Sequence, residues 1–346
     1  MRSVNSLRLK DLGEREIIRK LLELIPEPKL TRSNRIDDAV LLKDFDLVVS
    51  CDAVCDITDK LPGMKWADLG WKLGVMCVSD VASKGACPLG TLISLNAPSE
   101  LEMEVVEEFY EGLVEASREY GFEIWGGDLG EAPRFLASLF MLGKVKRRFI
   151  SRRGAREGDL VLVTGKFGLT GAAYHLLLRG GQAPSEHVRN TIVQAAYRPR
   201  ARLREGVILS EIDGVSSSID SSDGLAESLY QLCDVNQIGI VLERVPIAQE
   251  AIEYAEYNGI EPLELALYGG EEYEIVFTVR RSSLDEVLDR LLSIGCRAEV
   301  IGTVIKERGL FLKVEDQVQP IERRGWEHYS RSRNRNKYLG ANLCTW

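Results

Sequence analysis

Aspartates recur where helices and strands are expected to end, and this is the pattern in the chain that could do chemistry. Asp52 follows an apolar run at residues 47–49, which predicts a buried strand. Asp80 follows residues 66–77, whose apolar side chains recur at the spacing of one helix face. Two carboxylates that approach one point offer the oxygen ligands that Mg2+ prefers. Residues 47–88 therefore predict part of a metal site.

Two further stretches place carboxylates in the same way. Asp37 and Asp38 stand directly ahead of an apolar run at residues 39–42, although paired aspartates at a loop edge are also ordinary turn residues. Asp128 follows two glycines after the brief apolar run 124–125. Such glycines let a backbone approach a phosphate closely, and they also make common tight turns. The recurrence of such aspartates favours a metal site over separate turns. Carboxylates gathered at one site repel one another unless cations neutralise them.

The second half of the chain carries a denser motif at residues 220–224, Asp-Ser-Ser-Asp-Gly. It follows a predicted strand at residues 215–219 and opens a predicted helix at residues 225–233. A helix N-cap accounts for one or two of these residues. Two aspartates, two serines and a glycine together favour an anion or metal site at the start of the helix.

A basic connector at residues 147–156 contains five arginines and precedes a strand, a glycine-rich turn and a helix at residues 160–178. The arginines are either a solvated linker or, as at Arg152, forks that could hold phosphate oxygens. The turn lacks the Gly-Lys-Ser/Thr of a Walker loop, and the chain contains no G-x-G-x-x-G. If the protein handles ATP, it uses neither a Walker loop nor a protein-kinase loop.

Composition limits the classes of protein that need to be considered. The 346 residues are 45% apolar, enough for two cores, and a net charge of -9 argues against general nucleic-acid binding. No apolar run reaches the length of a membrane span and the charged N-terminus is unlike a secretory signal, so we expect a cytoplasmic protein without a membrane partner. Seven cysteines without a Cys-x-x-Cys pair and only three histidines leave catalysis to carboxylates, arginines and metal.

Expected helices and strands mix in both halves, which predicts a mixed α and β fold without a purely parallel sheet. We expect one domain at residues 1–146, a second at residues 147–330, and a loose basic tail at residues 331–346. The other expected elements are helices at residues 12–25, 101–120, 248–257 and 284–292 and strands at residues 92–95, 135–145, 160–163, 238–242, 274–279, 298–304 and 310–314.

Seven motifs occur in an order that resembles the thiamine-monophosphate kinases, a family related to aminoimidazole ribonucleotide synthetase, selenophosphate synthetase and the hydrogenase-maturation dehydratase. Each motif alone is weak, and their order makes the resemblance specific over about residues 12–329. The motifs are Asp37-Asp38-Ala39-Val40-Leu41, Ser50-Cys51-Asp52, residues 78–82 with 85–88, Gly126-Gly127-Asp128, residues 152–155 with Gly158-Asp159, residues 220–225, and residues 269–274.

The resemblance implies transfer of a phosphoryl group from ATP to the phosphate of thiamine monophosphate, giving thiamine diphosphate without a phosphoenzyme. It implies an N-terminal α/β domain whose sheet pairs with that of a second chain into a barrel, so that the protein is a homodimer, and a C-terminal α/β sandwich. ATP and several Mg2+ would lie in the cleft between the domains, and a need for K+ is left open. A site rich in Asp suits this reaction, because the charges of two reacting anions must be neutralised and aligned.

Site residues follow from the resemblance by position in the motifs. The residues closest to the reaction would be Asp80, Asp128, Asp220 and Arg152. The metal ligands would be Asp37, Ser50, Cys51, Asp52, Asp80, Asp128, Asp220 and Asp223. ATP would contact Tyr110, Gly127, Asp128, Arg152 and Ser222, and thiamine phosphate would contact Asp59, Glu271 and Trp326. Trp326 could stack on the substrate ring or pair with its cation, and it could equally be a core tryptophan.

The chain departs from the usual residues of that family at Ile36, Cys51 and Asp59, where Gly, Thr and His are common, and at Ser221 and Glu272. These changes bear on ligands and substrate contacts more than on the reaction class. Three alternatives stay open: another ATP-dependent synthetase of the same superfamily, a metal-dependent phosphatase, and a nucleotide-binding protein impaired in catalysis. Against the synthetases, the chain has neither a glycine-rich N-terminal loop with a reactive cysteine nor a terminal cysteine.

Overall fold

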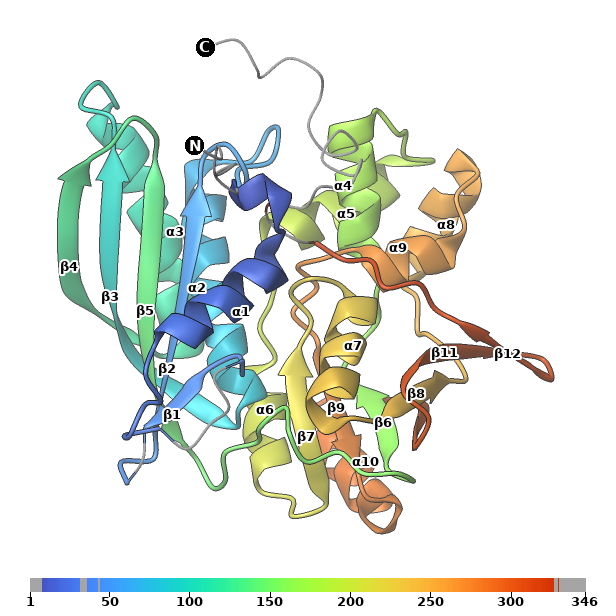
Figure 1. Cartoon of the computed structure of the whole chain (residues 1–346). Helices are drawn as coiled ribbons and strands as arrows, with labels where there is room; N and C mark the ends of the chain where they lie inside the picture. Colours follow the sequence, from blue (N-terminus) through green and yellow to red (C-terminus); the bar gives the residue numbers. More distant parts are fainter. Residues whose placement is uncertain (1–7, 32–35, 43, 327–328, 330–346) are drawn as a thin grey trace, which may run out of the picture.

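The computed structural model of the chain describes residues 8–31, 36–42, 44–326 and 329. Its strands form two sheets that lie side by side, with helices packed on and between them (Figure 1). The tail expected at residues 331–346 lies outside the described residues. Within the part of the chain that is described, no helix combines the length and the hydropathy needed to cross a membrane.

The first sheet has five strands in the order β1-β2-β5-β3-β4. Its neighbours run antiparallel except for β3 and β4, which are parallel. Helices α2 (Trp66–Ser83) and α3 (Met103–Tyr120) cover one face and lie behind the sheet in Figure 1. Burial alternates along the strands because successive side chains point to opposite faces. The strands are β1 (Val40–Leu42), β2 (Leu47–Cys55), β3 (Ala86–Ala97), β4 (Glu123–Glu131) and β5 (Leu136–Val145).

Glycines allow α2 and α3 to cross at close range. A Cβ on Gly70 of α2 would lie 1.9 Å from the backbone oxygen of Phe109, and a Cβ on Gly112 of α3 would lie 1.7 Å from that of Ala67. Any side chain at these two positions would push the helices apart. The close crossing fixes the position of α2, the helix that carries Asp80.

The second sheet has seven strands in the order β12-β11-β8-β10-β6-β9-β7, antiparallel except for β8 with β11. Every residue of its central strands β6 and β9 is buried, because both faces of the sheet are covered. Helix α7 (Leu225–Asn236) packs on one face, and α6 (Leu203–Ser210) and α10 (Leu284–Leu292) lie toward the other. The strands are β6 (Leu160–Val163), β7 (Val215–Asp220), β8 (Gly239–Leu242), β9 (Ile275–Val279), β10 (Glu299–Ile305), β11 (Gly309–Val314) and β12 (Gln317–Pro320).

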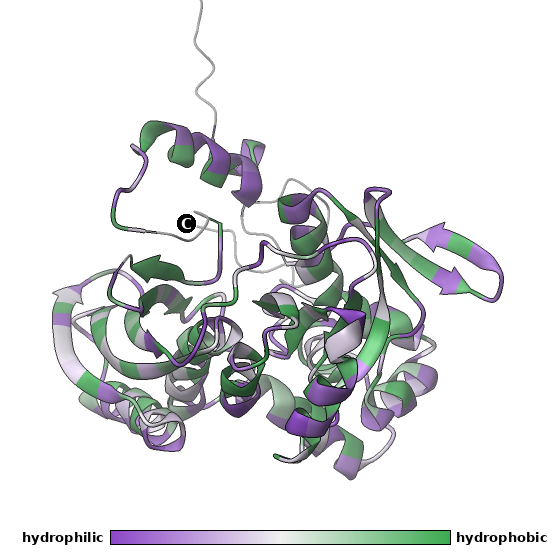
Figure 2. Cartoon of the chain, turned by 90° about the horizontal axis from the view of Figure 1, so that it is seen from below, coloured by the Kyte–Doolittle hydropathy of each residue, from purple (hydrophilic) through white to green (hydrophobic). Residues whose placement is uncertain are grey.

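The other helices surround these layers. Side chains from α4, α5 and α8 extend the core of the first sheet toward the second half of the chain. Seen from below and coloured by hydropathy, α1 lies at the edge of the molecule, apart from both sheets (Figure 2). These elements are α1 (Glu14–Leu24), α4 (Leu169–Arg179), α5 (Glu186–Tyr197), α8 (Gln249–Asn258) and α9 (Pro262–Tyr268), with short 3-10 turns at Leu9–Asp11 and Arg281–Ser283.

Several expectations about element ends were wrong. Asp52 lies in the middle of β2, and Gly126-Gly127-Asp128 lies inside β4 instead of ending it. A Cβ on Gly127 would come within 1.7 Å of the Ile93 oxygen on β3, so this glycine serves strand packing and not a turn. Helix α2 ends at Ser83, and Pro88 beyond it lies within β3, where the register shifts. Helices α5, α6 and α9 were not expected.

Candidate functional site

Carboxylates from three separate segments of the chain meet between the two sheets. Asp38 comes from the loop before β1, Asp80 from α2 and Asp220 from the end of β7. One carboxylate oxygen from each lies within 4.8 Å of the others. Ser79 donates a 2.7 Å hydrogen bond to Asp220 and so links α2 to β7 directly. The structure therefore brings together Asp80 and Asp220, which are 140 positions apart in the chain.

Burial and mutual repulsion raise the pKa values of several of these carboxyl groups. Burial, together with the charges of Asp52, Asp220 and Asp38, raises the pKa of Asp80 well above its usual range. Burial likewise raises the pKa of Asp52, and it raises the pKa of Asp220 and of Asp223 to about 7. These carboxyl groups are held where their charged form is disfavoured, and a nearby divalent cation reverses that preference.

A cationic side borders the same cluster. The ammonium of Lys84 lies 2.7 Å from Asp37 Oδ1 and 2.6 Å from Asp38 Oδ2, and Arg152 Nε donates to Asp38 Oδ1 at 2.8 Å. Burial alone would raise the pKa of Asp38, but Arg152 and Lys84 hold it below its usual value. Ser151 Oγ and the backbone N–H of Arg152 donate to Asp37. Asp37 and Asp38 are thus neutralised by side chains of the protein.

The other side of the cluster fits Mg2+. Two buried oxygens there, Asp52 Oδ2 and Ser221 Oγ, have no hydrogen-bond partner within the described structure. An unpaired buried polar atom costs about 1–3 kcal/mol, so such atoms call for a partner. The donor set consists of carboxylate and hydroxyl oxygens, which are ligands of hard cations. Asp52, Asp80 and Asp220 are the residues that could hold the ion, with Asp38 at their border.

A second polar group lies around Glu271. Its carboxylate accepts from Tyr174 and pairs at 2.6 Å with Lys72, a buried lysine of α2 whose ammonium also lies 3.4 Å from the backbone oxygen of Asp59. Glu271 and Tyr273 have φ angles of 65° and 53°, a left-handed conformation that is uncommon for residues with side chains. Backbone strain of this kind concentrates at functional sites.

Two of the three predicted substrate residues, Glu271 and Trp326, border the turn at residues 220–224. The N–H of Glu271 donates to the Ser222 oxygen at 2.6 Å, and the N–H of Trp326 donates to the Asp223 oxygen at 3.1 Å. The Trp326 side chain is partly open to solvent, with 42% of the residue exposed, so it is not a core tryptophan. The two residues therefore flank the same turn, next to Asp220.

Other predicted site residues are not among the three whose carboxylates form the cluster. Asp128 is exposed on the edge strand β4. Its neighbour Gly127 lies in the same cross-strand row as Asp52, with one residue each of β3 and β5 between them. Three strand spacings separate Gly127 from Asp52, which is about 14 Å. Cys51 is exposed on the face of β2 opposite Asp52, and Ser50 is buried with its hydroxyl donating to the Cys77 oxygen. Tyr110 lies on α3. The roles of these residues stay predictions.

Sequence reasoning missed Lys72, Lys84 and Tyr174. The sequence did contain an indication of the two lysines, because Lys72 interrupts a largely apolar helix and Lys84 ends it. A lysine in such a place is buried only if its charge has a partner. Nothing in the local pattern indicated the partners, since Asp37 and Glu271 are distant in the chain.

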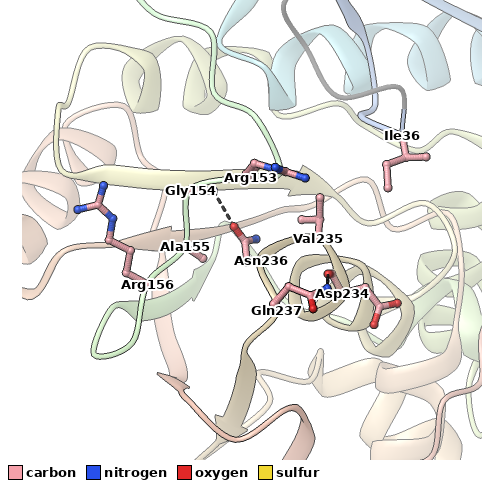
Figure 3. Close-up of a pocket in the computed structure, with 9 residues that line it drawn as sticks. All are labelled: Ile36, Arg153, Gly154, Ala155, Arg156, Asp234, Val235, Asn236 and Gln237. Carbon is pink, nitrogen blue, oxygen red and sulfur yellow. Dashed lines mark hydrogen bonds between the residues drawn. The ribbon is translucent and has the colours of Figure 1, made fainter. Parts of the chain in front are cut away.

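A cavity of about 720 Å³ lies beside the site and not within it (Figure 3). Arg153 and Arg156 are exposed on the connector that forms one wall, and the end of α7 forms the other. Asn236 ties the walls together, because it accepts from the Gly154 N–H and donates to the Arg152 oxygen. The lining residues are Ile36, Arg153, Gly154, Ala155, Arg156, Asp234, Val235, Asn236 and Gln237.

Comparisons with known proteins match both halves of the chain. Residues 36–145 match the N-terminal domain of AIR synthase related proteins and residues 156–315 match the C-terminal domain. The thiamine-monophosphate kinase of Pyrococcus horikoshii is 32% identical over 92% of this chain and 96% of its own length. A complex of AaThiL with AMPPCP and TMP has a TM-score of 0.82 at 30% identity, covering 94% of this chain and 99% of that one. The thiamine monophosphate kinase of Aquifex aeolicus has a TM-score of 0.78 at 30% identity, covering 92% and 100%. The expected mixed α/β fold of two domains is confirmed by these structures.

Replacing Asp80 by Asn should stabilise the metal-free protein and weaken its response to Mg2+. In EDTA at pH 8 we expect the Tm to rise by about 2 °C or more, because one buried repelling charge is lost. A carboxyl group whose pKa is raised in the folded state, as for Asp220 from 3.8 to about 7, binds its proton more tightly when folded. Its contribution to stability is complete below about pH 4 and is lost as the pH rises through 7.

Thermal unfolding with EDTA or Mg2+ between pH 5 and 8 measures both effects. The wild-type protein should lose stability with rising pH in EDTA, and Mg2+ should restore it. Asp289→Asn, an exposed change on α10, is the control. Equal stabilisation of wild type and Asp80→Asn by Mg2+ would show that Asp80 holds no metal.

Proposed function

The chain belongs to the thiamine-monophosphate kinase family, and from that premise we propose that it transfers the γ-phosphoryl group of ATP to the phosphate of thiamine monophosphate. An oxygen of the acceptor phosphate forms the new bond to the γ-phosphorus, the bond from that phosphorus to the bridging oxygen of ATP breaks, and ADP leaves. AMPPCP, bound by AaThiL, is an analogue of ATP, which supports ATP as the donor. The product is thiamine diphosphate.

The observation that carries the proposal is the cluster of Asp38, Asp80 and Asp220 at the junction of the two sheets. Joining two phosphates brings anion to anion, so the barrier is dominated by charge that must be neutralised while the reacting groups are held in line. Bound Mg2+ would supply positive charge to the phosphate oxygens. Asp52, Asp80 and Asp220 would hold it, for the reasons of donor type and unpaired oxygens given above.

More than one divalent ion is supported by the charge of the site. Six carboxylates gather there against two cations, Lys84 and Arg152, which leaves a formal charge of -4 that two divalent ions would cancel. The carboxylates are Asp37, Asp38, Asp52, Asp80, Asp220 and Asp223.

Residues of the chain orient the two substrates in this proposal. Arg152 donates four of its five guanidinium N–H groups to Asp38, Gln231 and the Ile36 oxygen, so it is a rigid edge of the phosphate site. The fifth N–H has no partner among the described residues and could donate to a phosphate oxygen. The exposed indole of Trp326 offers a flat apolar surface for the thiamine rings, and Glu271, held by Lys72 and Tyr174, offers a carboxylate to the positive thiazolium.

We expect the purified protein to form thiamine diphosphate from ATP, Mg2+ and thiamine monophosphate. Asp220→Asn should lower kcat by about 100-fold or more, because the change removes charge stabilisation where the phosphates react. Separation of thiamine phosphates by chromatography gives the product directly, and Asp289→Asn should keep wild-type turnover. Release of ADP without thiamine diphosphate would favour a synthetase or hydrolase instead.

We also propose that the protein is a homodimer in which the first sheet pairs with its copy into a barrel. The face of this sheet opposite α2 and α3 exposes apolar side chains, among them the paired Leu92 and Phe140 at 50% and Leu136 at 40%. An exposed apolar patch on neighbouring strands is typical of an interface. In such a dimer, β4 of one chain could bring its Asp128 to the site of the other chain.

We further propose that the domains are residues 1–146 and 147–330 and that the protein is located in the cytoplasm.

Phe140→Arg should convert the dimer into monomers, because a charge would be buried in the apolar interface. Light scattering after size-exclusion chromatography measures the mass of the 38.7 kDa chain and of its assemblies. Tyr257→Arg, on α8 in the other half and 59% exposed, should leave the mass of the wild type. A monomeric wild type, or a dimeric Phe140→Arg, would refute the barrel.

A further inference from the structure

Lys84 has the contacts of a bound cation. It follows α2, none of its surface is exposed, and its ammonium lies 2.7 Å from Asp37 Oδ1, 2.6 Å from Asp38 Oδ2 and 2.7 Å from the Ser218 oxygen. An ammonium has three N–H donors, and here three oxygens accept them. A lysine is almost never fully buried unless its charge is paired in this way.

The oxygens of the carboxylates that Lys84 contacts already accept hydrogen bonds from other groups as well. Besides Lys84, Asp37 accepts from Ser151 Oγ at 2.6 Å and from the Arg152 N–H, and its side chain is fully buried. Asp38 accepts from Ser83 Oγ at 2.8 Å and from the Arg152 guanidinium. A divalent ion bound to Asp37 would have to displace a lysine that is fully buried.

The neighbouring carboxylates present the opposite situation. Among the described residues, no lysine or arginine forms an ion pair with Asp52, Asp80 or Asp220. Asp52 Oδ2 has no partner at all in that part of the chain, and the partner of Asp220 is the neutral hydroxyl of Ser79. Positive charge is therefore built into one half of the carboxylate cluster and missing from the other.

We propose that Lys84 is an internal cation that occupies the Asp37–Asp38 end of the site, so that this pair binds no divalent ion and metal is confined to Asp52, Asp80 and Asp220. The inference rests on the proposed function only for the identity of the metal. Lys84 is a positioning residue, because it holds Asp38, and Asp38 holds Arg152 at the edge of the phosphate site. It also links the end of α2 to β7 through the Ser218 oxygen.

Counting Mn2+ ions on the full-length protein without substrates tests the proposal. Lys84→Met keeps the length of the side chain and removes its charge, and we expect it to bind one more Mn2+ per chain than the wild type by titration calorimetry and electron paramagnetic resonance. Its Tm should fall in EDTA and recover further with Mn2+ than that of the wild type. Lys144→Met, an exposed lysine on β5, should change neither quantity. An unchanged Mn2+ count in folded Lys84→Met would overturn the proposal.

Asp37→Asn in the presence of Lys84 gives an independent answer, even if Lys84→Met does not fold. The proposal predicts the wild-type number of Mn2+ ions, because Asp37 holds none. The loss of one Mn2+ would identify Asp37 as a ligand and contradict it. Since no step requires turnover, a normal metal count without formation of thiamine diphosphate would refute the kinase activity and leave the role of Lys84 intact.

Discussion

Like charges buried together between two sheets are the constraint on which the rest of the structure depends. Asp38, Asp80 and Asp220 come from distant parts of the chain, and each would be more stable apart from the others. The packing of α2 holds them together, through its glycine crossing with α3 and the Ser79 hydrogen bond to β7. Repulsion among the gathered carboxylates lowers the free energy of unfolding, and binding of a divalent cation raises it again. Folding and metal binding are therefore coupled.

The protein divides the task of neutralising these carboxylates between its own side chains and added metal. Lys84 and Arg152 compensate Asp37 and Asp38 permanently, and both cations are also tied to neighbouring backbone oxygens. Asp52 and Asp80 have no such partners within the described ranges, and burial raises their pKa values. Fixed cations hold the site in shape before any substrate arrives, while exchangeable cations can enter with the nucleotide phosphates. Such preorganisation lowers the cost of aligning two anions.

The sequence was sufficient for the reaction class and for most of the elements, because both depend on local patterns. Apolar periodicity located α1, α2, α3, α7 and α10, and the motif around Asp220 was placed correctly at the start of a helix. Helix α5 could also have been found, from Val188, Ile192 and Ala196 and from Ser185, which caps it. The glycines before Asp128 were wrongly expected to end a strand, because the nearness of β3 that requires Gly127 is a tertiary contact. Lys72 and Lys84 were missed for the same reason, since each partner lies far away in the chain.

Anomalous diffraction from crystals of the wild-type protein grown with Mn2+ and AMPPCP tests the central claim most directly. We expect manganese peaks bounded by oxygens of Asp52, Asp80 and Asp220, next to the phosphates of the nucleotide, and no peak in contact with Asp37. Manganese bound only at other carboxylates, or no manganese at this junction at saturating concentration, would contradict the claim that the fold gathers these side chains to hold metal.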